Sequence, residues 1–386
     1  MRDPLSRESV LELLQLLIRT PSVNPHLAPE ETGTGEEAIA HAVRSWFEQH
    51  GVRTWLDEIE PGRCNAIGEV GTGASALVLC GHLDTVATSG MTIPAFDPRV
   101  EGDRVYGRGS VDMKGGVASI MAAMAALAQD PLPGRVLAAL VADEEYASIG
   151  ADHFVARYPA DACIVTEPTA TGLEELVLAH KGFVWFRIRT QGRAAHGSRW
   201  DLGESAVAKM GRIIAALDDF DRTVLRKRTH PLVGPASMHP SVVHGGSGWS
   251  TYAAECTLQV ERRTIPGEHT DGVLEEIREL IAGLGIAAEV ELEFARAPMT
   301  CSPDAHIARC VRDAVTHVTG TTPRDSGVAY WMDAAVFAER GIPVVDVGAK
   351  GAGAHEPIEW IDLNSVVECA HVLVHAARQF FSGADS

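Results

Sequence analysis

A histidine and an aspartate follow an apolar run in the first third of the chain. Ala76–Cys80 is typical of a buried strand, Gly81 ends it, and His82 and Asp84 follow two positions apart. If the extended backbone continues, both side chains point to the same side. A neutral imidazole binds metal ions, and a nearby carboxylate orients the ring. The pair therefore predicts a metal site at the end of this strand.

Further acidic or imidazole side chains stand in comparable positions. Each follows an apolar strand or a glycine-rich loop, and they are Asp112, the pair Glu144 and Glu145, Glu167 and His355. The set offers only nitrogen and oxygen ligands, with one carboxylate able to bridge two ions and another left over as a base. A hydrolytic site with two zinc ions requires such a set. Each residue alone is equally typical of a polar loop or a helix cap, but together they indicate a two-metal centre.

A nucleotide site is the competing interpretation of Gly107 and Gly109. The third glycine of a dinucleotide fingerprint is replaced by Asp112, and no Gly-Lys-Ser/Thr triplet occurs here. The formal net charge of -19 also argues against nucleic acid or an anionic membrane as partner, because a phosphate-binding surface needs clustered Lys and Arg. Nucleotide binding is therefore disfavoured.

Apolar strands alternate with helices in the first 180 residues. Strands are predicted near 52–56, 65–70, 77–80, 135–141 and 160–165, and helices at 5–19, 36–50, 116–129 and 149–157. Polar residues stand at the carboxyl ends of the strands, where sites form in parallel sheets. We therefore expect an α/β fold with a mostly parallel sheet and flanking helices.

The pattern changes near Lys181. Strands near 182–190, 241–244, 253–262 and 287–294 and helices near 203–217 and 271–284 give the order β-α-β-β-α-β, which predicts an inserted antiparallel sheet with two helices. After Pro303 the first pattern returns, with helices to about 318, at 333–340 and at 364–380, and a strand at 343–347. The inserted α+β unit therefore interrupts the α/β domain.

Seven cysteines are scattered, mostly through apolar segments, without a Cys-x-x-Cys pair. They are typical of reduced core residues in a cytoplasmic protein rather than of thiolate ligands. The first ten residues are charged and no apolar run approaches the length of a membrane span, so neither a signal peptide nor a transmembrane helix is expected.

Seven short motifs stand in order along nearly the whole chain. They are Gly81–Val86, Gly107–Gly116, Asp143–Glu145, Thr166–Thr169, Gly192–Ser198, Arg263–Gly267 and Ala354–Pro357. Together they resemble the M20 family of metallopeptidases and deacylases, which includes acetylornithine deacetylases, succinyl-diaminopimelate desuccinylases, aminoacylases and glutamate carboxypeptidases. The resemblance implies a di-zinc catalytic domain in two parts, 1–180 and 295–386, and a lid or dimerisation domain at 181–294.

The resemblance also implies the ligand set. One zinc ion would be held by His82 and Glu167, the other by Glu145 and His355, with Asp112 bridging the two. Cobalt or manganese could occupy the same ligands.

The resemblance further assigns the residues that act on the water. Asp84 would orient His82, and Glu144 would be the general base that takes a proton from the metal-bridging water as it attacks the acyl carbon. The peptide bond between Asp112 and Met113 would be cis.

Four residues of the inserted unit bear on the substrate. By the resemblance, His196 would stabilise the oxyanion, either from a partner subunit or after closure, and Arg263 would bind the substrate carboxylate. The neighbouring Arg262 could take the second role. Ser250 stands where the family often has Asn, which leaves the identity of the substrate open.

The expected function is zinc-dependent hydrolysis of the amide bond of an N-acyl amino acid, in the manner of acetylornithine deacetylase. A dipeptidase or carboxypeptidase of the same chemistry, or a succinyl-diaminopimelate desuccinylase, is the alternative. A non-catalytic binding relative would have lost a ligand or the base, and the sequence retains all of them. A homodimer formed through the lid domain is expected, with a small N-acyl amino acid or dipeptide as substrate.

Overall fold

The computed structural model describes residues 2–31, 35–130 and 132–382. The chain forms two compact units, the first comprising Met1–Leu178, Cys301–Ser326 and Met332–Ser386, the second Ala179–Thr300 and Gly327–Trp331. The second unit is larger than the predicted insertion at 181–294. Two hydrogen bonds explain part of the difference, because Lys181 N donates to Val328 O at 3.3 Å and Trp331 Nε1 to Ala297 O at 3.1 Å.

A mixed sheet forms the core of the first unit. Its strands follow the order β1 (Arg53–Glu60), β2 (Arg63–Gly71), β6 (Arg135–Val141), β3 (Ala76–His82), β7 (Ala162–Val165), β17 (Val344–Asp346), β8 (Glu175–His180) and β15 (Met299–Thr300), and β16 (Arg324–Val328) also pairs with β8. The four central strands β6, β3, β7 and β17 are parallel, while β1, β2 and β8 pair in an antiparallel manner. The predicted mostly parallel sheet is confirmed for its centre.

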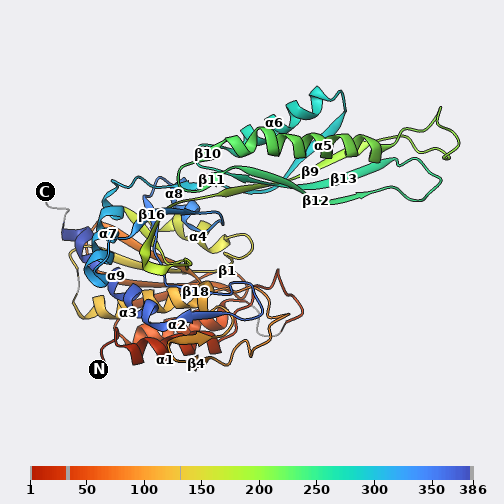
Figure 1. Cartoon of the computed structure of the whole chain (residues 1–386). Helices are drawn as coiled ribbons and strands as arrows, with labels where there is room; N and C mark the ends of the chain where they lie inside the picture. The colour runs from red at the N-terminus through yellow and green to blue at the C-terminus, as the bar shows by residue number, and fades with distance from the viewer. Residues whose placement is uncertain (1, 32–34, 131, 383–386) are drawn as a thin grey trace. The chain divides into compact units, whose positions relative to one another are not determined.

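Helices lie on both faces of this sheet. Figure 1 shows α1 (Arg7–Arg19), α2 (Glu37–Gln49) and α3 (Gly115–Gln129) on one face, and α4 (Ile149–Arg157) and α8 (Ala334–Glu339) on the other. Two further helices, α7 (His306–Thr319) and α9 (Leu363–Ser382), pack on each other, and α9 also packs on α3. The short helical turns are η1 (Ser110–Lys114), η2 (Gly172–Glu174) and, in the second unit, η3 (Leu225–Lys227).

One helical segment has the length and apolar composition of a membrane span, contrary to the sequence-based expectation. It is Ser110–Gln129, and 83% of its most apolar window is buried inside the fold. Its alanine and methionine side chains pack beneath the sheet and against α9. The segment is therefore the central core helix of the first unit.

A second, small sheet was not predicted. It joins β18 (Gly351–Ala352), β19 (Trp360–Asp362), β5 (Arg104–Tyr106) and β4 (Arg99–Glu101) in that order. Strands of two or three residues are too short to show a periodic pattern, so they cannot be recognised from the sequence. The sheet brings the segment before η1 next to a segment about 250 residues further along the chain, as the register Trp360↔Tyr106 shows.

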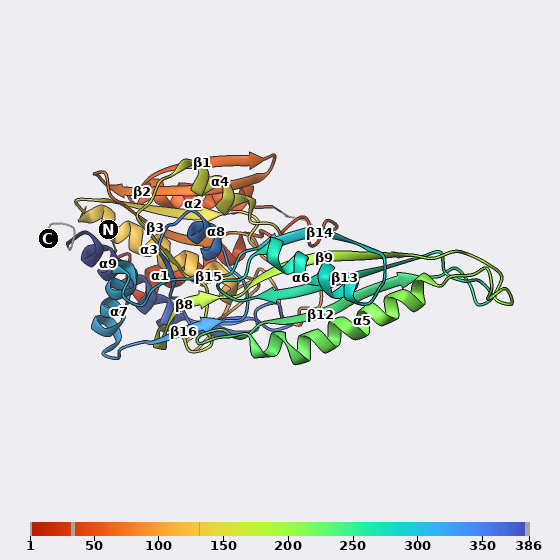
Figure 2. The same ribbon diagram turned by 90° about the horizontal axis from the view of Figure 1, so that it is seen from above.

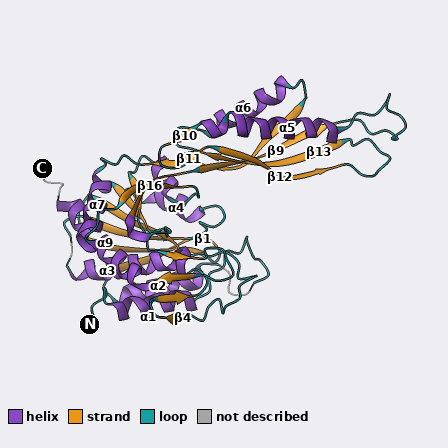
Figure 3. Cartoon of the chain, in the orientation of Figure 1, coloured by secondary structure: helices purple, strands orange, loops and turns teal. Residues whose placement is uncertain are grey.

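The second unit has the predicted β-α-β-β-α-β order. Its antiparallel sheet runs β12 (Ser237–Gly245), β13 (Glu255–Thr264), β9 (Gly182–Gln191) and β14 (Ala288–Arg296), and α5 (Ala206–Thr223) and α6 (Thr270–Gly283) pack on it (Figures 2 and 3). The short strands β10 (Thr229–His230) and β11 (Gly234–Pro235) pair with each other in a separate two-stranded sheet. The helix α5 starts later than predicted because the Ser205 side chain caps it, accepting a hydrogen bond from Ala208 N.

Alternation along the strands decides which side chains this unit buries. Phe186 and Ile188 of β9 lie in the core with Met210 of α5 and Ile277 of α6. Trp185, the residue before Phe186, is on the open face of the sheet and is 41% exposed. One face of the sheet is therefore covered by helices and the other is polar and aromatic.

Candidate metal centre

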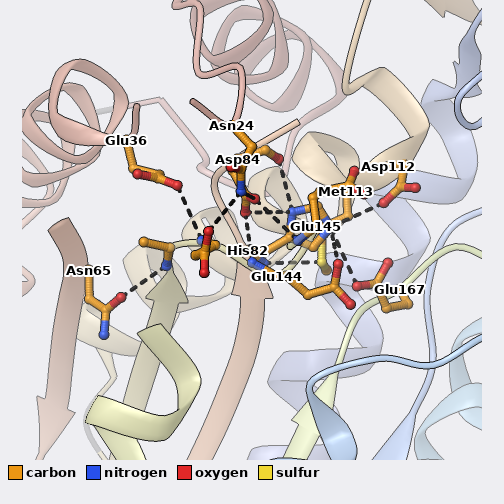
Figure 4. Close-up of polar contacts among 12 residues, drawn as sticks. Asn24, Glu36, Asn65, His82, Asp84, Asp112, Met113, Glu144, Glu145 and Glu167 are labelled. Carbon is orange, nitrogen blue, oxygen red and sulfur yellow. Dashed lines mark hydrogen bonds and ion pairs between the residues drawn. The ribbon is translucent and has the colours of Figure 1, made fainter. Parts of the chain in front are cut away.

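Three neighbouring parallel strands deliver most of the site. The register pairs His82 with Val141 and Cys80 with Val165, so β6, β3 and β7 end at nearly the same level. All seven residues of β3 are buried, which holds His82, its last residue, rigidly at the edge of the sheet. The chain leaving β6 carries Glu144 and Glu145, and the chain leaving β7 carries Glu167. These segments meet at one edge of the sheet, as the sequence predicted (Figure 4).

The remaining two residues lie in segments joined to the strands of the small sheet. Asp112 lies in η1, which follows β5, and His355 lies in the turn between β18 and β19. The peptide bond between Asp112 and Met113 is cis, as the resemblance implied. His355 has a φ of 62°, a left-handed conformation that costs a residue with a Cβ about 1 kcal/mol or more and is common at functional sites.

The Asp112 carboxylate lies between the two histidines. Its Oδ1 is 3.1 Å from His82 Nε2, and its Oδ2 is 3.2 Å from His355 Nε2. Glu145 Oε2 is 3.1 Å from the same nitrogen of His355, and Glu167 Oε1 is 3.6 Å from His82 Nε2. Each imidazole therefore faces one oxygen of Asp112 and one further carboxylate.

The structure places Glu144 slightly further from the imidazoles than these carboxylates. Its Oε2 lies 3.9 Å from His82 Nε2. The donor atoms of His82, Glu144 and Glu167 lie within 4.8 Å of one another, as do those of His82, Asp112 and Glu145. The geometry therefore allows Glu144 to be a base beside the ions or a third ligand.

Asp84 contacts His82 as predicted and also binds a neighbouring segment. His82 Nδ1 lies 2.9 Å from the Asp84 backbone carbonyl and 3.4 Å from carboxylate Oδ1. The carboxylate accepts the backbone N–H groups of Glu144 at 3.1 Å and Glu145 at 3.2 Å. Asp84 thus contacts both the histidine and the segment that carries the paired glutamates.

The crowding of carboxylates perturbs their protonation. Burial, and then the charge of Asp112, raises the pKa of Glu145 to about 7. Burial and neighbouring carboxylates raise the pKa of Glu144 and that of Glu167 well above the usual value. Hydrogen bonds to Asp112 and Glu145 raise the pKa of His355 to about 10. The site therefore has an excess of negative charge, which bound cations would relieve.

These residues fit a pair of divalent cations. The donors are only imidazole nitrogens and carboxylate oxygens, which suit zinc and related ions. Glu145 Oε1 is buried and has no hydrogen-bond partner in the part of the chain that the structure describes. A buried acceptor without a donor costs about 1–3 kcal/mol, and a metal ion would satisfy it.

One glycine shows how closely the segments pack. A Cβ on Gly348, in the loop after β17, would lie 2.0 Å from the backbone oxygen of Glu167. Only glycine allows this approach, so the loop that leads toward His355 supports the segment that carries Glu167.

The predicted substrate residues belong to the second unit. His196 is exposed, and its Nδ1 lies 2.8 Å from Ser198 Oγ. Arg263 lies on the open face of the sheet, where Nε donates to Glu261 Oε1 at 2.8 Å and the guanidinium stacks over Phe183. Their roles stay predictions.

The structure distinguishes the two adjacent arginines. Arg262 is 1% exposed, and its Nη2 donates to Glu268 Oε1, whereas the Arg263 side chain is 33% exposed. Neighbouring residues of a strand point to opposite faces. Of the two, Arg263 alone is accessible to a substrate.

The residues that support the segments carrying the ligands were not identified from the sequence. They are buried polar side chains that contact the ligand segments: Asn24, Glu36, Arg63, Arg108, Asp346 and Glu359. Arg108 and Glu359, for example, are 251 positions apart in the sequence, so no local spacing connects them.

Comparisons with known proteins agree with this geometry. The family model described as peptidase family M20/M25/M40 matches residues 78–379. Acetylornithine deacetylase of Vibrio atlanticus is 26% identical over 382 residues, which cover 96% of this chain and 98% of the relative.

Solved structures show a similar fold. Aminopeptidase PepT from Bacillus cereus has a TM-score of 0.79 at 18% identity and covers 97% of this chain and 99% of its own. The YXEP protein of Bacillus subtilis, described as a dinuclear metal binding peptidase from the M20 family, has a TM-score of 0.74 at 16% identity and covers 97% and 98% of the two chains.

Proposed function

Because the chain belongs to peptidase family M20/M25/M40 and is thus a hydrolase of amide bonds, we propose that it removes the acyl group from an N-acyl amino acid. Acetylornithine is the leading substrate, since a relative matched over nearly the full length is an acetylornithine deacetylase. The resident ions are two zinc ions, held by His82, Glu167, Glu145 and His355 with Asp112 between them.

The placement of Asp112 is the observation that carries the proposal. A carboxylate whose two oxygens face two different imidazoles, at 3.1 and 3.2 Å, has the geometry of a bridging ligand. Each imidazole also faces one further carboxylate, which supplies an equal set of donors on either side. An ordinary ion-pair cluster has no need for this symmetry.

Glu144 and the bound cations have separate roles in the proposed reaction. Two bound cations lower the pKa of a shared water and polarise the amide carbonyl. Glu144 takes the proton from the attacking water and passes it to the leaving amine. Burial, and then neighbouring carboxylates, raise the pKa of Glu144 well above its usual value when no metal is bound.

Two further assignments concern the second unit. His196 stabilises the developing oxyanion, and Arg263 binds the substrate carboxylate through its guanidinium fork. The chain acts as a homodimer through this unit. It works in the cytoplasm, a compartment in which its seven buried, free cysteines would stay reduced.

A substrate panel tests the proposal. Ninhydrin detection measures amine release from N-acetyl, N-succinyl and N-formyl amino acids and from dipeptides, with zinc or cobalt and with a chelator control. Chelator-sensitive release from N-acetyl amino acids supports the deacetylase. Release from N-succinyl substrates alone points to a desuccinylase, and release from dipeptides alone to a peptidase. No release with two metals bound contradicts the enzyme proposal and favours a binding protein.

A further inference from the structure

The acidic residues of the metal centre share a feature in their backbone. The N–H of each is held by a buried carboxylate: Asp112 N donates to Glu359 Oε1 at 3.2 Å, and Glu167 N donates to Asp346 Oδ1 at 2.8 Å. Glu144 and Glu145 donate to Asp84 in the same way. A set of buried carboxylates therefore fixes the main chain from which the ligand side chains project.

Buried arginines neutralise two of the carboxylates that hold these segments. Arg63 donates to Glu36 through Nε at 2.5 Å and Nη2 at 2.8 Å, and the two side chains are 5% and 0% exposed. Arg108 Nη1 donates to Glu359 Oε2 at 2.7 Å, with side chains 3% and 1% exposed. Such pairs hold their geometry well, since removing one partner would leave an uncompensated buried charge.

The Arg63 pair supports the segment with the paired glutamates. Arg63 Nη2 also donates to Asp143 Oδ1 at 2.6 Å, and Glu36 Oε1 accepts the N–H of Asp143 at 3.2 Å. Asn24 Nδ2 donates to the same oxygen of Asp143 and to Asp84 Oδ2, at 2.9 and 2.8 Å. These contacts connect Arg63 to the carboxylate that holds the next two amides. Figure 4 shows Glu36, Asn24 and Asp84 on the side of the glutamates away from Asp112.

The conformation of Asp143 explains why such support is needed. Its φ is 70°, in the left-handed region that a residue with a Cβ seldom adopts. Both its N–H and its carboxylate are held by the Arg63 pair, which keeps the turn in this conformation. The turn sets the direction in which Glu144 and Glu145 leave the strand.

The Arg108 pair supports the bridging residue. Besides Asp112 N, Glu359 accepts the N–H groups of Gly109 at 3.0 Å and Val111 at 2.9 Å. Arg108 itself is tied to Ala87 O through Nε at 3.1 Å. One carboxylate therefore holds three amides of the turn that presents Asp112.

We propose that Arg63 and Arg108 are positioning residues of the metal centre, each setting the place of a different ligand segment through its buried glutamate. The inference rests on the proposed two-metal function. Arg63 acts on Glu144 and Glu145, and Arg108 acts on Asp112. A displacement of about 1 Å in such a site costs roughly a hundredfold in rate, and loss of outer support costs about 10–100-fold in metal affinity.

The test compares Arg63→Met and Arg108→Met with wild type and with Val43→Ala. Val43 is a fully buried residue of α2 without a polar contact to the site, so its variant reports a stability loss alone. Zinc affinity is measured by competition with a chromophoric chelator, cobalt coordination by its visible absorption, and stability by thermal unfolding. The values of kcat and KM follow for the substrate that the panel identifies.

The two arginine variants should differ from each other. Arg63→Met should lower the affinity for one of the two ions about 10–100-fold and lower kcat with little change in KM. Arg108→Met should lower the affinity for both ions, because Asp112 is proposed to bind both. Val43→Ala should lower the unfolding midpoint and leave the affinities and the cobalt spectrum unchanged.

Arginine-to-lysine variants keep the test decisive if the Met variants do not fold. A lysine retains the charge but carries its donors on a single nitrogen. It therefore cannot reproduce the contacts of Arg63 with Glu36 and Asp143, or those of Arg108 with Glu359 and Ala87 O. Folded Arg63→Lys and Arg108→Lys with wild-type zinc affinities, cobalt spectrum and kcat would overturn the proposal. A wild type that binds no metal would instead refute the proposed function itself.

Discussion

Replacement of Glu144 by Gln tests whether this residue is the base or a ligand. The substitution keeps the shape of the side chain and removes its ability to take up a proton. Its Oε2 lies 3.9 Å from His82 Nε2, further than the nearest oxygens of Asp112 at 3.1 Å and Glu167 at 3.6 Å. If Glu144 is the base, Glu144→Gln should retain both metal ions.

The expected loss of activity is large. A positioned general base contributes about 10²–10⁴-fold to the rate, which corresponds to about 3–5 kcal/mol of transition-state stabilisation. The loss should appear in kcat, with KM nearly unchanged, because the proton moves only in the transition state.

Stability gives an independent readout. Burial and nearby carboxylates raise the pKa of Glu144, so its ionised form opposes folding at neutral pH when no metal is bound. The metal-free Gln variant should therefore unfold at a higher temperature than the metal-free wild type.

The comparison variant is Glu145→Gln. Glu145 Oε2 lies 3.1 Å from His355 Nε2, and its second oxygen has no hydrogen-bond partner among the described residues, so this variant should lose one metal ion. Metal content, measured by mass spectrometry, and turnover, measured by steady-state kinetics, distinguish a base from a ligand. Near-wild-type turnover of Glu144→Gln with two ions bound would refute the base, and loss of an ion from it would make Glu144 a ligand.

Four further predictions concern the rest of the molecule. Burial lowers the pKa of His180 to about 4, so below the unfolded value of about 6.5 the unfolded chain binds a proton that the folded chain does not. The free energy of unfolding should therefore fall by about 3 kcal/mol from pH 6.5 to 4. Urea unfolding of His180→Gln at a series of pH values should show a fall that is smaller by this amount. An equal fall in both proteins would contradict the prediction. Arg263→Ala should raise KM about tenfold and lower stability by about 1 kcal/mol or less, because a partly exposed ion pair contributes little. Arg262→Ala should lower stability by about 3 kcal/mol, because it leaves Glu268 without its buried partner. Calorimetry and kinetics that give the reverse order would exclude Arg263 as the carboxylate anchor. Gly348→Ala should weaken metal binding, because its Cβ would displace the backbone of Glu167, and an unchanged zinc titration would contradict that contact. Chelation should lower the unfolding free energy by about 4 kcal/mol for each of the two ions, relative to protein with free metal at a thousand times the Kd of each site, and a midpoint that does not move would mean that no metal is bound.

The sequence was sufficient for the parts of the site that depend on local pattern. Apolar strands at 77–80, 135–141 and 160–165, each followed by polar residues, predicted a parallel sheet with His82, Glu144, Glu145 and Glu167 at one edge. The structure confirms the sheet and brings these side chains together. The parallel arrangement explains this success, since it aligns the carboxyl ends of adjacent strands.

The sequence was insufficient where partners are distant and strands are short. The small sheet that places Asp112 near His355 joins strands of two or three residues, which leave no periodic signal. The Asp84 carboxylate lies 3.4 Å from His82 Nδ1, as expected, but the sequence did not show that it also accepts the amides of Glu144 and Glu145. A carboxylate accepts whichever donors the fold brings to it, and the sequence does not state which those are.

Residue types and strand order alone thus determined the chemistry that the edge of the sheet can perform. The tertiary structure decided which atoms meet: that Asp112 lies between two imidazoles, that Arg262 is buried and Arg263 accessible, and that two arginines stand behind the ligand segments. The physical reason is that a local pattern fixes which residues share a face, whereas distances across the fold depend on the packing of segments from the whole chain.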